Sequence, residues 1–301
     1  MLRSSDSGQG RSAKLGRMSS NKIPPDLLKR FIDEWSLGDD PRFNEVMASL
    51  LTHLHDFIWE TQLSDEEWLT ALQFLTQTGK LCDGWRDEFQ LLSDVLGATT
   101  SINEINHDVA SGLTDAAVLG PFYAEGSREI KSGDSIVGQE MEGGEPALVF
   151  GKVLDDKGIP ISGALLDIWQ VAPNQMYAIQ DEGQENLNLR ARLYSEEDGS
   201  YSFLTYKPPP YPIPRDGTVG QLLDIGKRHG MRPAHIHFIV TAPGHERVIT
   251  QLFTDDDRYL WSDAVFGEKG SLLVSYARNE NPELEVEWIL DYDFKLEKSP
   301  S

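Results

Sequence analysis

Two histidines separated by a single residue give residues 232–240 the clearest chemical potential in the chain. The segment reads Arg-Pro-Ala-His-Ile-His-Phe-Ile-Val, which is apolar, partly β-branched and typical of a strand with a proline at its start. Alternate side chains of a strand point to opposite faces, so His235 and His237 share a face about 6.6 Å apart along the chain. Ile236 and Phe238 then face a core. Two imidazoles on one rigid strand make a pair of metal ligands.

Other interpretations of this pair stay open on the residues alone. A strand with two hydrogen-bonded histidines needs no metal, and cysteine partners of a structural zinc site are missing. A cupin-type metal enzyme also uses His-x-His, but Thr241 and Ala242 stand where its glutamate is expected. His53 and His55 repeat the spacing on an expected helix, where they point roughly 200° apart and cannot share a metal. We therefore interpret the second pair as surface or helix-packing residues.

The composition excludes several classes of protein. Among 301 residues, 49 acidic and 27 basic side chains leave a formal charge of -22, which disfavours binding to nucleic acid or anionic membranes. A single cysteine, Cys82, cannot form an intrachain disulfide and fits a reducing, cytoplasmic location. The sequence has no apolar run of the roughly 18 residues needed to span a membrane. Residues 1–22 are expected to form a disordered tail, with a mitochondrial presequence as the alternative.

Helical periodicity dominates the first part of the chain and strand periodicity the second. Helices are expected to begin at Pro24-Pro25, Asp40-Pro41, the capping box Ser64-x-x-Glu67 and Asp83, the last one ending at Gly97. Strands are expected at 147–154, 164–169, 199–205, 232–240, 247–253, 284–290 and 292–296. Short strands at this spacing, with Gly and Pro turns, predict a β-sandwich or barrel. Residues 170–190 and 207–230 lack a strand pattern, and loops of that length are commonly functional.

Five motifs occur in a fixed order along the chain. They are Leu119-Gly120-Pro121-Phe122-Tyr123, Asp167-Ile168-Trp169-Gln170 followed by Tyr177, Pro210-Tyr211-Pro212-Ile213-Pro214, the segment 232–238, and Thr250-Gln251-Leu252-Phe253. In this order and spacing the chain resembles the intradiol ring-cleaving dioxygenases, which include catechol, chlorocatechol and hydroxyquinol 1,2-dioxygenases. The resemblance implies a mainly β fold, with a helical dimerisation domain at 23–118 and a β-sandwich catalytic domain at 119–301. It also implies a homodimer that can hold lipid at the helical domain.

The resemblance further implies one non-haem Fe(III) held by Tyr177, Tyr211, His235 and His237. Without it, neither tyrosine could be selected from the nine in the chain. Phenolate oxygen suits a hard cation, and a nearby cation lowers a tyrosine pKa far below about 10. In the family, the second tyrosine leaves the metal as an aromatic diol or triol binds, and then serves as its base. Arg232 and Gln251 are the other implied catalytic residues, which act on the ring during its cleavage by O2.

Three segments most resemble the hydroxyquinol branch: residues 91–94, 210–220 and 263–267. We therefore expect hydroxyquinol (benzene-1,2,4-triol) as the substrate and 3-hydroxy-cis,cis-muconate or maleylacetate as the product, with catechol as the alternative substrate. The expected pocket comprises Leu91, Asp94, Val118, Leu119, Gly120, Pro121, Phe122, Ile213, Pro214, Arg232 and Val265. Ordinary core packing remains the alternative for Leu91 and Val118.

A function of a different class also has support in the sequence. The pattern of residues 151–164, Gly-x-Val-x-Asp-x-x-Gly-x-Pro-Ile-x-Gly-Ala, is also found in transthyretin-like sandwich modules that only bind or connect. Such a module needs no paired tyrosine and histidine ligands, so their joint presence argues against it.

Overall fold

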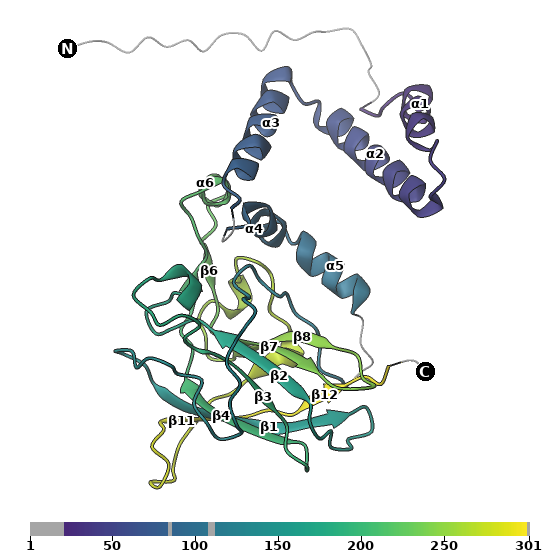
Figure 1. The fold of residues 1–301 in the computed structure, drawn as a ribbon. Helices are drawn as coiled ribbons and strands as arrows, with labels where there is room; N and C mark the ends of the chain where they lie inside the picture. The colour runs from purple at the N-terminus through teal and green to yellow at the C-terminus, as the bar shows by residue number, and fades with distance from the viewer. Residues whose placement is uncertain (1–20, 84–85, 108–111, 300–301) are drawn as a thin grey trace, which may run out of the picture. The chain divides into compact units, whose positions relative to one another are not determined.

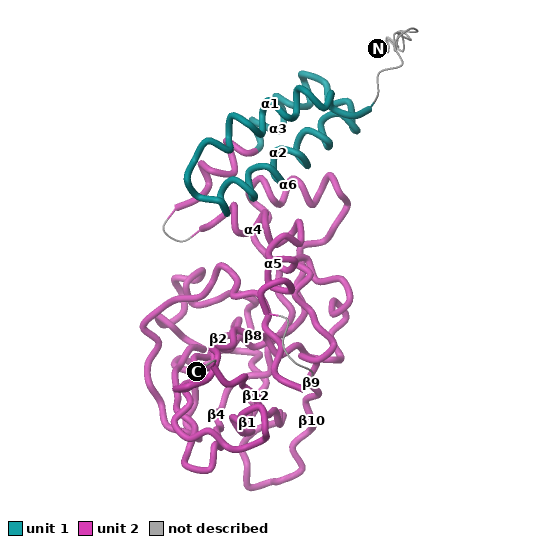
Figure 2. Tube along the Cα trace, turned by 90° about the vertical axis from the view of Figure 1, so that its right-hand side faces the viewer, with its two compact units in different colours: residues 1–74 teal, residues 75–301 magenta. Residues whose placement is uncertain are grey.

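The computed structural model describes residues 21–83, 86–107 and 112–299, so nearly all of the tail expected at 1–22 lies outside it. The chain divides into two compact units, Met1–Phe74 and Leu75–Ser301, which Figure 2 colours separately. Helices expected in one domain at 23–118 therefore fall in both units. Among the described residues, no helix is long and apolar enough to cross a membrane.

The first unit is helical, with α1 (Pro25–Trp35), α2 (Pro41–Thr61) and most of α3 (Asp65–Lys80). The expected caps are confirmed: the Asp40 carboxylate accepts from the first backbone N–H groups of α2. The Ser64 hydroxyl accepts from the backbone N–H of Glu67, whose carboxylate accepts from the N–H of Ser64. His55 stacks on Phe31 with ring centroids 4.6 Å apart and so packs α1 against α2, while His53 is exposed, as expected for surface or helix-packing residues.

The helical part of the second unit differs from the expectation. α4 (Glu88–Val95) begins five residues later than expected, because the Asp87 carboxylate caps it and accepts from the backbone N–H of Gln90. Asp83 instead accepts from the backbone N–H of Arg86 in a turn. Gly97, with a φ of 75°, separates α4 from α5 (Ala98–Asn106), a helix that the sequence pattern did not predict.

Two five-stranded sheets form the expected sandwich (Figure 1). One has the order β10-β11-β1-β12, with β4 also on β1, and the other the order β3-β2-β7-β8-β9. The strands are β1 (Pro146–Asp155), β2 (Leu165–Gln170), β3 (Arg190–Tyr194), β4 (Ser200–Tyr206), β5 (Tyr211–Pro212), β6 (Met231–Arg232), β7 (His235–Thr241), β8 (Val248–Thr254), β9 (Leu273–Val274), β10 (Ala277–Arg278), β11 (Trp288–Asp291) and β12 (Phe294–Leu296). β1 pairs antiparallel with β4 but parallel with β11 and β12, which places Val153 opposite Phe294.

The inner faces of the two sheets pack into one apolar core. Phe238 of the second sheet contacts both Phe203 and Phe294 of the first, at ring centroid distances of 6.2 and 4.9 Å. Ile236 is fully buried in the same cluster. The prediction that Ile236 and Phe238 share the core face is therefore confirmed, and the intervening His235 and His237 point to the other face.

The outer face of the second sheet carries a row of polar and aromatic residues. Arg190 of β3 lies opposite Trp169 of β2, Trp169 opposite His237 of β7, and His237 opposite Gln251 of β8. All four side chains are buried. This face is covered by the loops that the sequence pattern left without strands, so the long connections lie over the row.

The expected strand at 232–240 is two strands in the structure. Pro233 lacks an N–H group and interrupts the ladder, so β6 ends at Arg232 and β7 begins at His235. β6 pairs with the short β5, which places Tyr211 opposite Arg232. Between them lies α6 (Thr218–Ile225), another element that the sequence did not predict.

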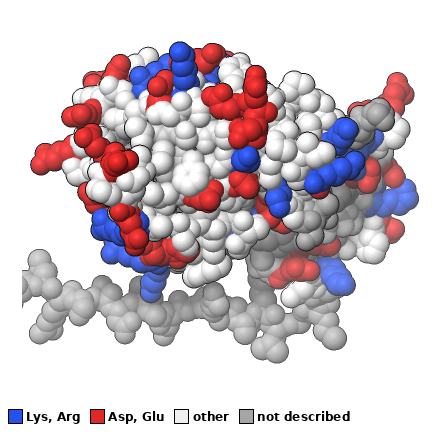
Figure 3. Space-filling model, turned by 90° about the horizontal axis from the view of Figure 1, so that it is seen from below, with Lys and Arg blue, Asp and Glu red and all other residues white. Residues whose placement is uncertain are grey.

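One face of the protein shows how charged side chains are distributed on it. On the face drawn in Figure 3, acidic groups lie next to basic ones across the protein. A continuous basic track of the kind that binds a nucleic-acid backbone is missing from this face.

Candidate active site

Four donor atoms from three separate segments converge beside the outer face of the second sheet. The Nε2 atoms of His235 and His237 are 3.1 Å apart, and His237 Nε2 is also 3.1 Å from the Tyr177 hydroxyl oxygen. The Tyr177 hydroxyl donates to the Tyr211 hydroxyl oxygen at 3.2 Å. All four side chains are at least 98 % buried. The structure thus brings together the four residues that the resemblance implied as metal ligands.

Neighbouring groups fix the orientation of three of the four donors. His235 Nδ1 donates to the carbonyl of Pro233 at 2.7 Å, so its Nε2 presents a lone pair toward the site. The His237 ring stacks on Trp169 with centroids 4.6 Å apart, and the Tyr177 ring stacks on Phe122 at 4.9 Å. These contacts hold the rings in place before anything binds.

A glycine beside His237 makes this packing feasible. Gly120 has a φ of 76°, in the left-handed region that side chains disfavour. A Cβ atom there would lie 3.5 Å from His237 Cε1. The glycine of the Leu-Gly-Pro-Phe motif is therefore required chiefly by its backbone conformation.

Burial has opposite effects on the two kinds of donor. It raises the pKa of Tyr177 well above its ordinary value of about 10 and also raises that of Tyr211. Burial lowers the pKa of His235 and of His237 well below the ordinary value. The histidines are therefore neutral and can donate lone pairs, whereas the tyrosines need a nearby cation to ionise.

The donor set fits a hard, trivalent metal ion. Ligands about 2 Å from one metal lie roughly 2.8–3.3 Å apart, which matches the separations of 3.1–3.2 Å here. A set of two phenol oxygens and two imidazoles suits iron better than it suits a metal that prefers thiolate ligands. Within the described ranges, His, Cys, Asp and Glu form no cluster of three or more that could hold a metal. The two tyrosines therefore complete the site.

Arg232 lies beside these donors and is held from three sides. Its Nε and Nη2 donate to the Asp263 carboxylate at 3.1 and 3.0 Å, and Nη2 also donates to Gln251 Oε1 at 2.9 Å. Its Nη1 is 3.4 Å from the Tyr211 hydroxyl oxygen and 3.2 Å from His235 Nε2. In the sequence, Asp263 stands out only as the first residue of the segment 263–267 that resembles the hydroxyquinol branch. Its contact with Arg232 shows that it holds the guanidinium in place.

A hollow of about 280 Å³ opens beside the donors. Four of the expected pocket residues line it: Leu91, Pro121, Phe122 and Pro214. The sequence analysis missed the remaining lining residues, which are Arg86, Asp87, Ile179, Gln180 and Asp216. Phe122 lines this hollow and stacks on Tyr177, so the hollow ends next to the donor cluster.

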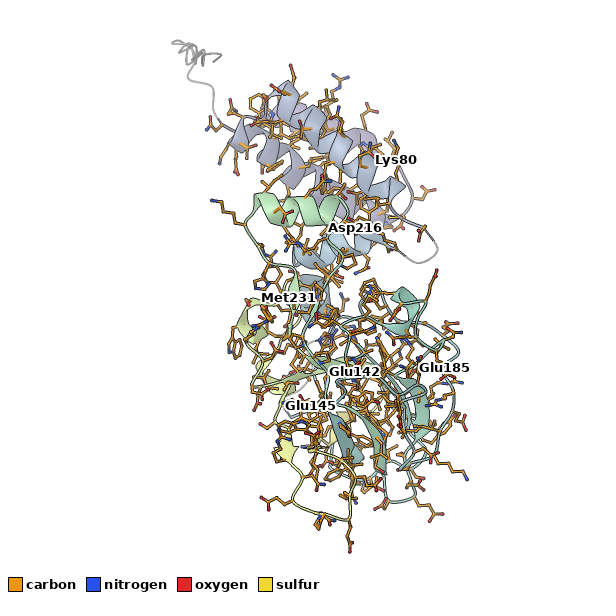
Figure 4. All side chains as sticks on the ribbon, turned by 90° about the vertical axis from the view of Figure 1, so that its left-hand side faces the viewer. Lys80, Glu142, Glu145, Glu185, Asp216 and Met231 are labelled. Atoms are coloured by element: carbon orange, nitrogen blue, oxygen red, sulfur yellow. The ribbon has the colours of Figure 1, made fainter. Side chains whose placement is uncertain are left out.

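An ion pair lies at the rim of the hollow. Arg86 Nη1 is 2.8 Å from the Asp216 carboxylate, which Figure 4 labels in the loop before α6. Arg86 also pairs with the fully buried Glu88, which accepts from the backbone N–H of Val219 at the start of α6. The sequence pattern could not predict the pair of Arg86 and Asp216, because these two residues are 130 positions apart.

The remaining expected pocket residues lie elsewhere around the site. The lining of this hollow does not include Asp94, Val118, Leu119, Gly120, Ile213, Arg232 or Val265, although most of them are buried. Asp94 is 2 % exposed and its carboxylate accepts from Gln90 Nε2 at 2.8 Å. Burial raises the pKa of Asp94, while the positive charge of Arg232 opposes this shift. Val118 contributes its carbonyl, which accepts from Gln251 Nε2.

Comparison with known proteins identifies the class. Residues 40–114 match the model of the catechol dioxygenase N terminus, and residues 118–298 match that of the dioxygenase domain. A hydroxyquinol 1,2-dioxygenase of Rhizobium is 42% identical over 86% of this chain and 90% of its own length. A catechol 1,2-dioxygenase of Candida albicans is 37% identical over 87% of this chain and 89% of its own length.

A solved structure agrees in fold. The hydroxyquinol 1,2-dioxygenase of Pseudomonas putida superposes with a TM-score of 0.84 at 43% identity, covering 91% of this chain and 98% of the other. The chain belongs to the intradiol ring-cleaving dioxygenases. It resembles the hydroxyquinol branch of that family. The expected sandwich with an N-terminal helical region is confirmed, and the interpretation as a non-catalytic module is set aside.

Proposed function

We propose that this chain is an Fe(III)-dependent dioxygenase that cleaves hydroxyquinol between its two adjacent hydroxylated carbons. The observation that carries the proposal is the convergence of Tyr177, Tyr211, His235 and His237 in a buried site beside Arg232. The similarity to hydroxyquinol 1,2-dioxygenases supports the choice of substrate.

The proposed reaction inserts both atoms of O2 into the ring. The bond between C1 and C2 of benzene-1,2,4-triol breaks, and each of these carbons becomes a carboxyl group. The product has the composition of the triol plus O2, which is 3-hydroxy-cis,cis-muconate, the enol form of maleylacetate. No other oxidant or reductant is consumed.

The roles of the site residues follow from their contacts. Fe(III) would be held by Tyr177, Tyr211, His235 and His237, and when bound it would supply Lewis-acid activation of the substrate hydroxyls. The Tyr211 oxygen accepts from Arg232 and is positioned to take a proton from the second hydroxyl. Arg232, held by Asp263 and Gln251, would stabilise negative charge that develops on the ring.

Residues around the pocket bind the ring, exclude water and recognise the third hydroxyl in the proposed mechanism. Leu91, Pro121 and Phe122 present apolar surface to a flat ring and exclude water from it. Asp94 does not line the hollow, but it lies one helical turn beyond Leu91, and we propose it as the partner of the third hydroxyl. A site that hydrogen-bonds a hydroxyl discriminates far better than an apolar slot.

Cleavage of catechol is the second candidate, favoured by the Candida relative. A substrate panel on purified, iron-loaded protein decides between the two. We expect hydroxyquinol to be turned over faster than catechol, with bulky substituted catechols poor. Faster turnover of catechol would place the enzyme in the catechol branch, and a colourless, iron-free protein would refute both candidates.

We further propose a cytoplasmic homodimer that pairs through the helices of the first unit and can hold lipid there. Large apolar side chains of these helices are exposed, including Trp35, Leu50 and Phe57 at 52%, 54% and 50%. A two-fold axis would cover them on both copies. Light scattering should give twice the chain mass, whereas a concentration-independent monomer would refute the dimer. Organic extraction followed by mass spectrometry tests for the lipid.

A further inference from the structure

Arg190 is a buried cation that the proposed mechanism does not use. It lies on β3 opposite Trp169 with none of its surface exposed. Its Nη2 donates to the carbonyl of Phe122. Its Nε and Nη1 have no hydrogen-bond partner in the part of the chain that the structure describes. Burying a guanidinium without a paired carboxylate costs free energy, so the buried Arg190 calls for a function that offsets this cost.

The surroundings of Arg190 converge on one metal-site residue. The centre of its guanidinium lies 5.8 Å from the centroid of the Tyr177 ring. The Phe122 residue whose carbonyl it holds stacks on the same ring, with centroids 4.9 Å apart and planes inclined by 29°. Arg190 therefore acts on Tyr177 twice, directly through its charge and indirectly by fixing the loop that packs on the ring.

The two tyrosines of the site have different cationic neighbours. The Arg232 guanidinium beside Tyr211 is neutralised by its two-point ion pair with Asp263, and it reaches the hydroxyl itself. The Arg190 guanidinium beside Tyr177 contacts the ring rather than the hydroxyl. The carboxylate of Asp167 acts on Arg190 through space, but its Oδ2 accepts from the Tyr123 hydroxyl instead. The positive charge next to Tyr177 thus has no carboxylate in direct ion-pair contact among the described residues.

We propose that Arg190 is a positioning residue that holds the Tyr177 ring in place as a ligand of the metal and tunes the energy of its bonding electrons. The inference rests on the proposed iron site. The guanidinium lowers the energy of the phenolate electrons and, through the Phe122 carbonyl, fixes the ring from its stacked side. Removing a group of this kind from around a metal ligand typically lowers metal affinity or activity about 10- to 100-fold.

The visible charge-transfer band from tyrosinate to Fe(III) provides the test, together with the metal affinity. Arg190→Gln keeps a donor for the Phe122 carbonyl but removes the charge, and Arg190→Lys keeps the charge. We expect the band of the substrate-free Gln variant to move to longer wavelength, because the phenolate electrons are no longer stabilised. Its iron should be lost to a chelator at about tenfold lower chelator concentration. The Lys variant should keep the band near its original position.

Arg192→Met is the matched control. Arg192 lies two residues further along β3 and also holds a loop carbonyl, that of Ser127, but no contact with Tyr177 is seen. Its variant should leave the band unmoved. The proposal is overturned if the band of Arg190→Gln stays in place, or if Lys and Gln shift it equally. Absence of iron and of any band in the unaltered protein would instead refute the proposed function.

Discussion

Arg232 and Asp263 form a two-point ion pair that is almost completely buried. The Nε–Oδ1 and Nη2–Oδ2 distances are 3.1 and 3.0 Å, and the two side chains are 4% and 0% exposed. The Asp263 carboxylate also accepts from the backbone N–H groups of Val265 and Gly267. The planar fork of Arg232 is therefore fixed in the orientation that presents its third nitrogen to Tyr211.

Asp263→Asn should destabilise the protein and impair catalysis. Breaking a buried pair by removing one partner costs about 3–5 kcal/mol, because the remaining charge is left uncompensated. Denaturant unfolding measures this loss. Asp256→Asn is the control: Asp256 pairs with Lys207 at 3.2 Å but is 66% exposed, so its removal should cost at most about 1 kcal/mol. Similar losses in both variants would contradict the interpretation of the buried pair.

His235→Ala and His237→Ala should each give a folded protein with little iron. Both Nε2 atoms belong to the donor cluster, and removing one leaves too few ligands to retain the metal. Metal analysis of the purified variants measures this. His53→Ala changes the other His-x-His pair, which lies on α2, and should retain iron like the unaltered protein. Full iron occupancy in either strand variant would refute the assigned ligands.

Asp94→Ala should reduce activity on hydroxyquinol selectively. Losing a hydrogen bond to a buried carboxylate costs about 1–3 kcal/mol, which corresponds to about a 10- to 100-fold loss in kcat/KM. Catechol lacks the third hydroxyl, so its turnover should change little. Steady-state kinetics on both substrates are the measurement. Equal losses on the two would show that Asp94 supports the fold through its contact with Gln90 and does not contact substrate.

Gly120→Ala should reduce stability while leaving the metal bound. The positive φ of 76° costs a residue with a side chain about 1–2 kcal/mol, whereas the new methyl group would meet His237 at an ordinary contact distance of 3.5 Å. Gly270→Ala is the control, because nothing lies within 4 Å of its added methyl group and its φ is not in the strained region. Loss of iron from Gly120→Ala would mean that the added methyl group displaces His237, although the contact distance of 3.5 Å predicts that it does not.

Sequence reasoning located half of the proposed metal site without any relative. His235 and His237 were predicted to share a face, because strand alternation leaves no other arrangement, and their Nε2 atoms do meet. Tyr177 and Tyr211 could not be found in this way. One precedes a 3-10 turn in a loop and the other begins a two-residue strand, so neither lies in a periodic element. Only the family resemblance pointed to them.

The missed elements have a common physical cause. β3 has only five residues, in which the outward-facing Arg190 and Arg192 alternate with the core residues Ala191 and Leu193, so no apolar run marked it as a strand. The early start expected for α4 followed from the apolar residues near Asp83, whereas the cap that forms belongs to Asp87. In both cases a long-range or capping contact decided the structure, and local periodicity does not report such contacts.

The parallel pairing of β1 with β11 and β12 determines when the first sheet can be completed during synthesis on the ribosome. Val149 and Val153 find their partners Leu290 and Phe294 only after the chain has grown by 141 further positions. Until then, the middle strand of the first sheet has β4 on one side and an unpaired edge on the other. A nascent chain in this state is open to pairing with a neighbouring chain, and closure over so long a loop is slow. The sandwich is therefore sealed by β11 and β12, which are synthesised long after β1.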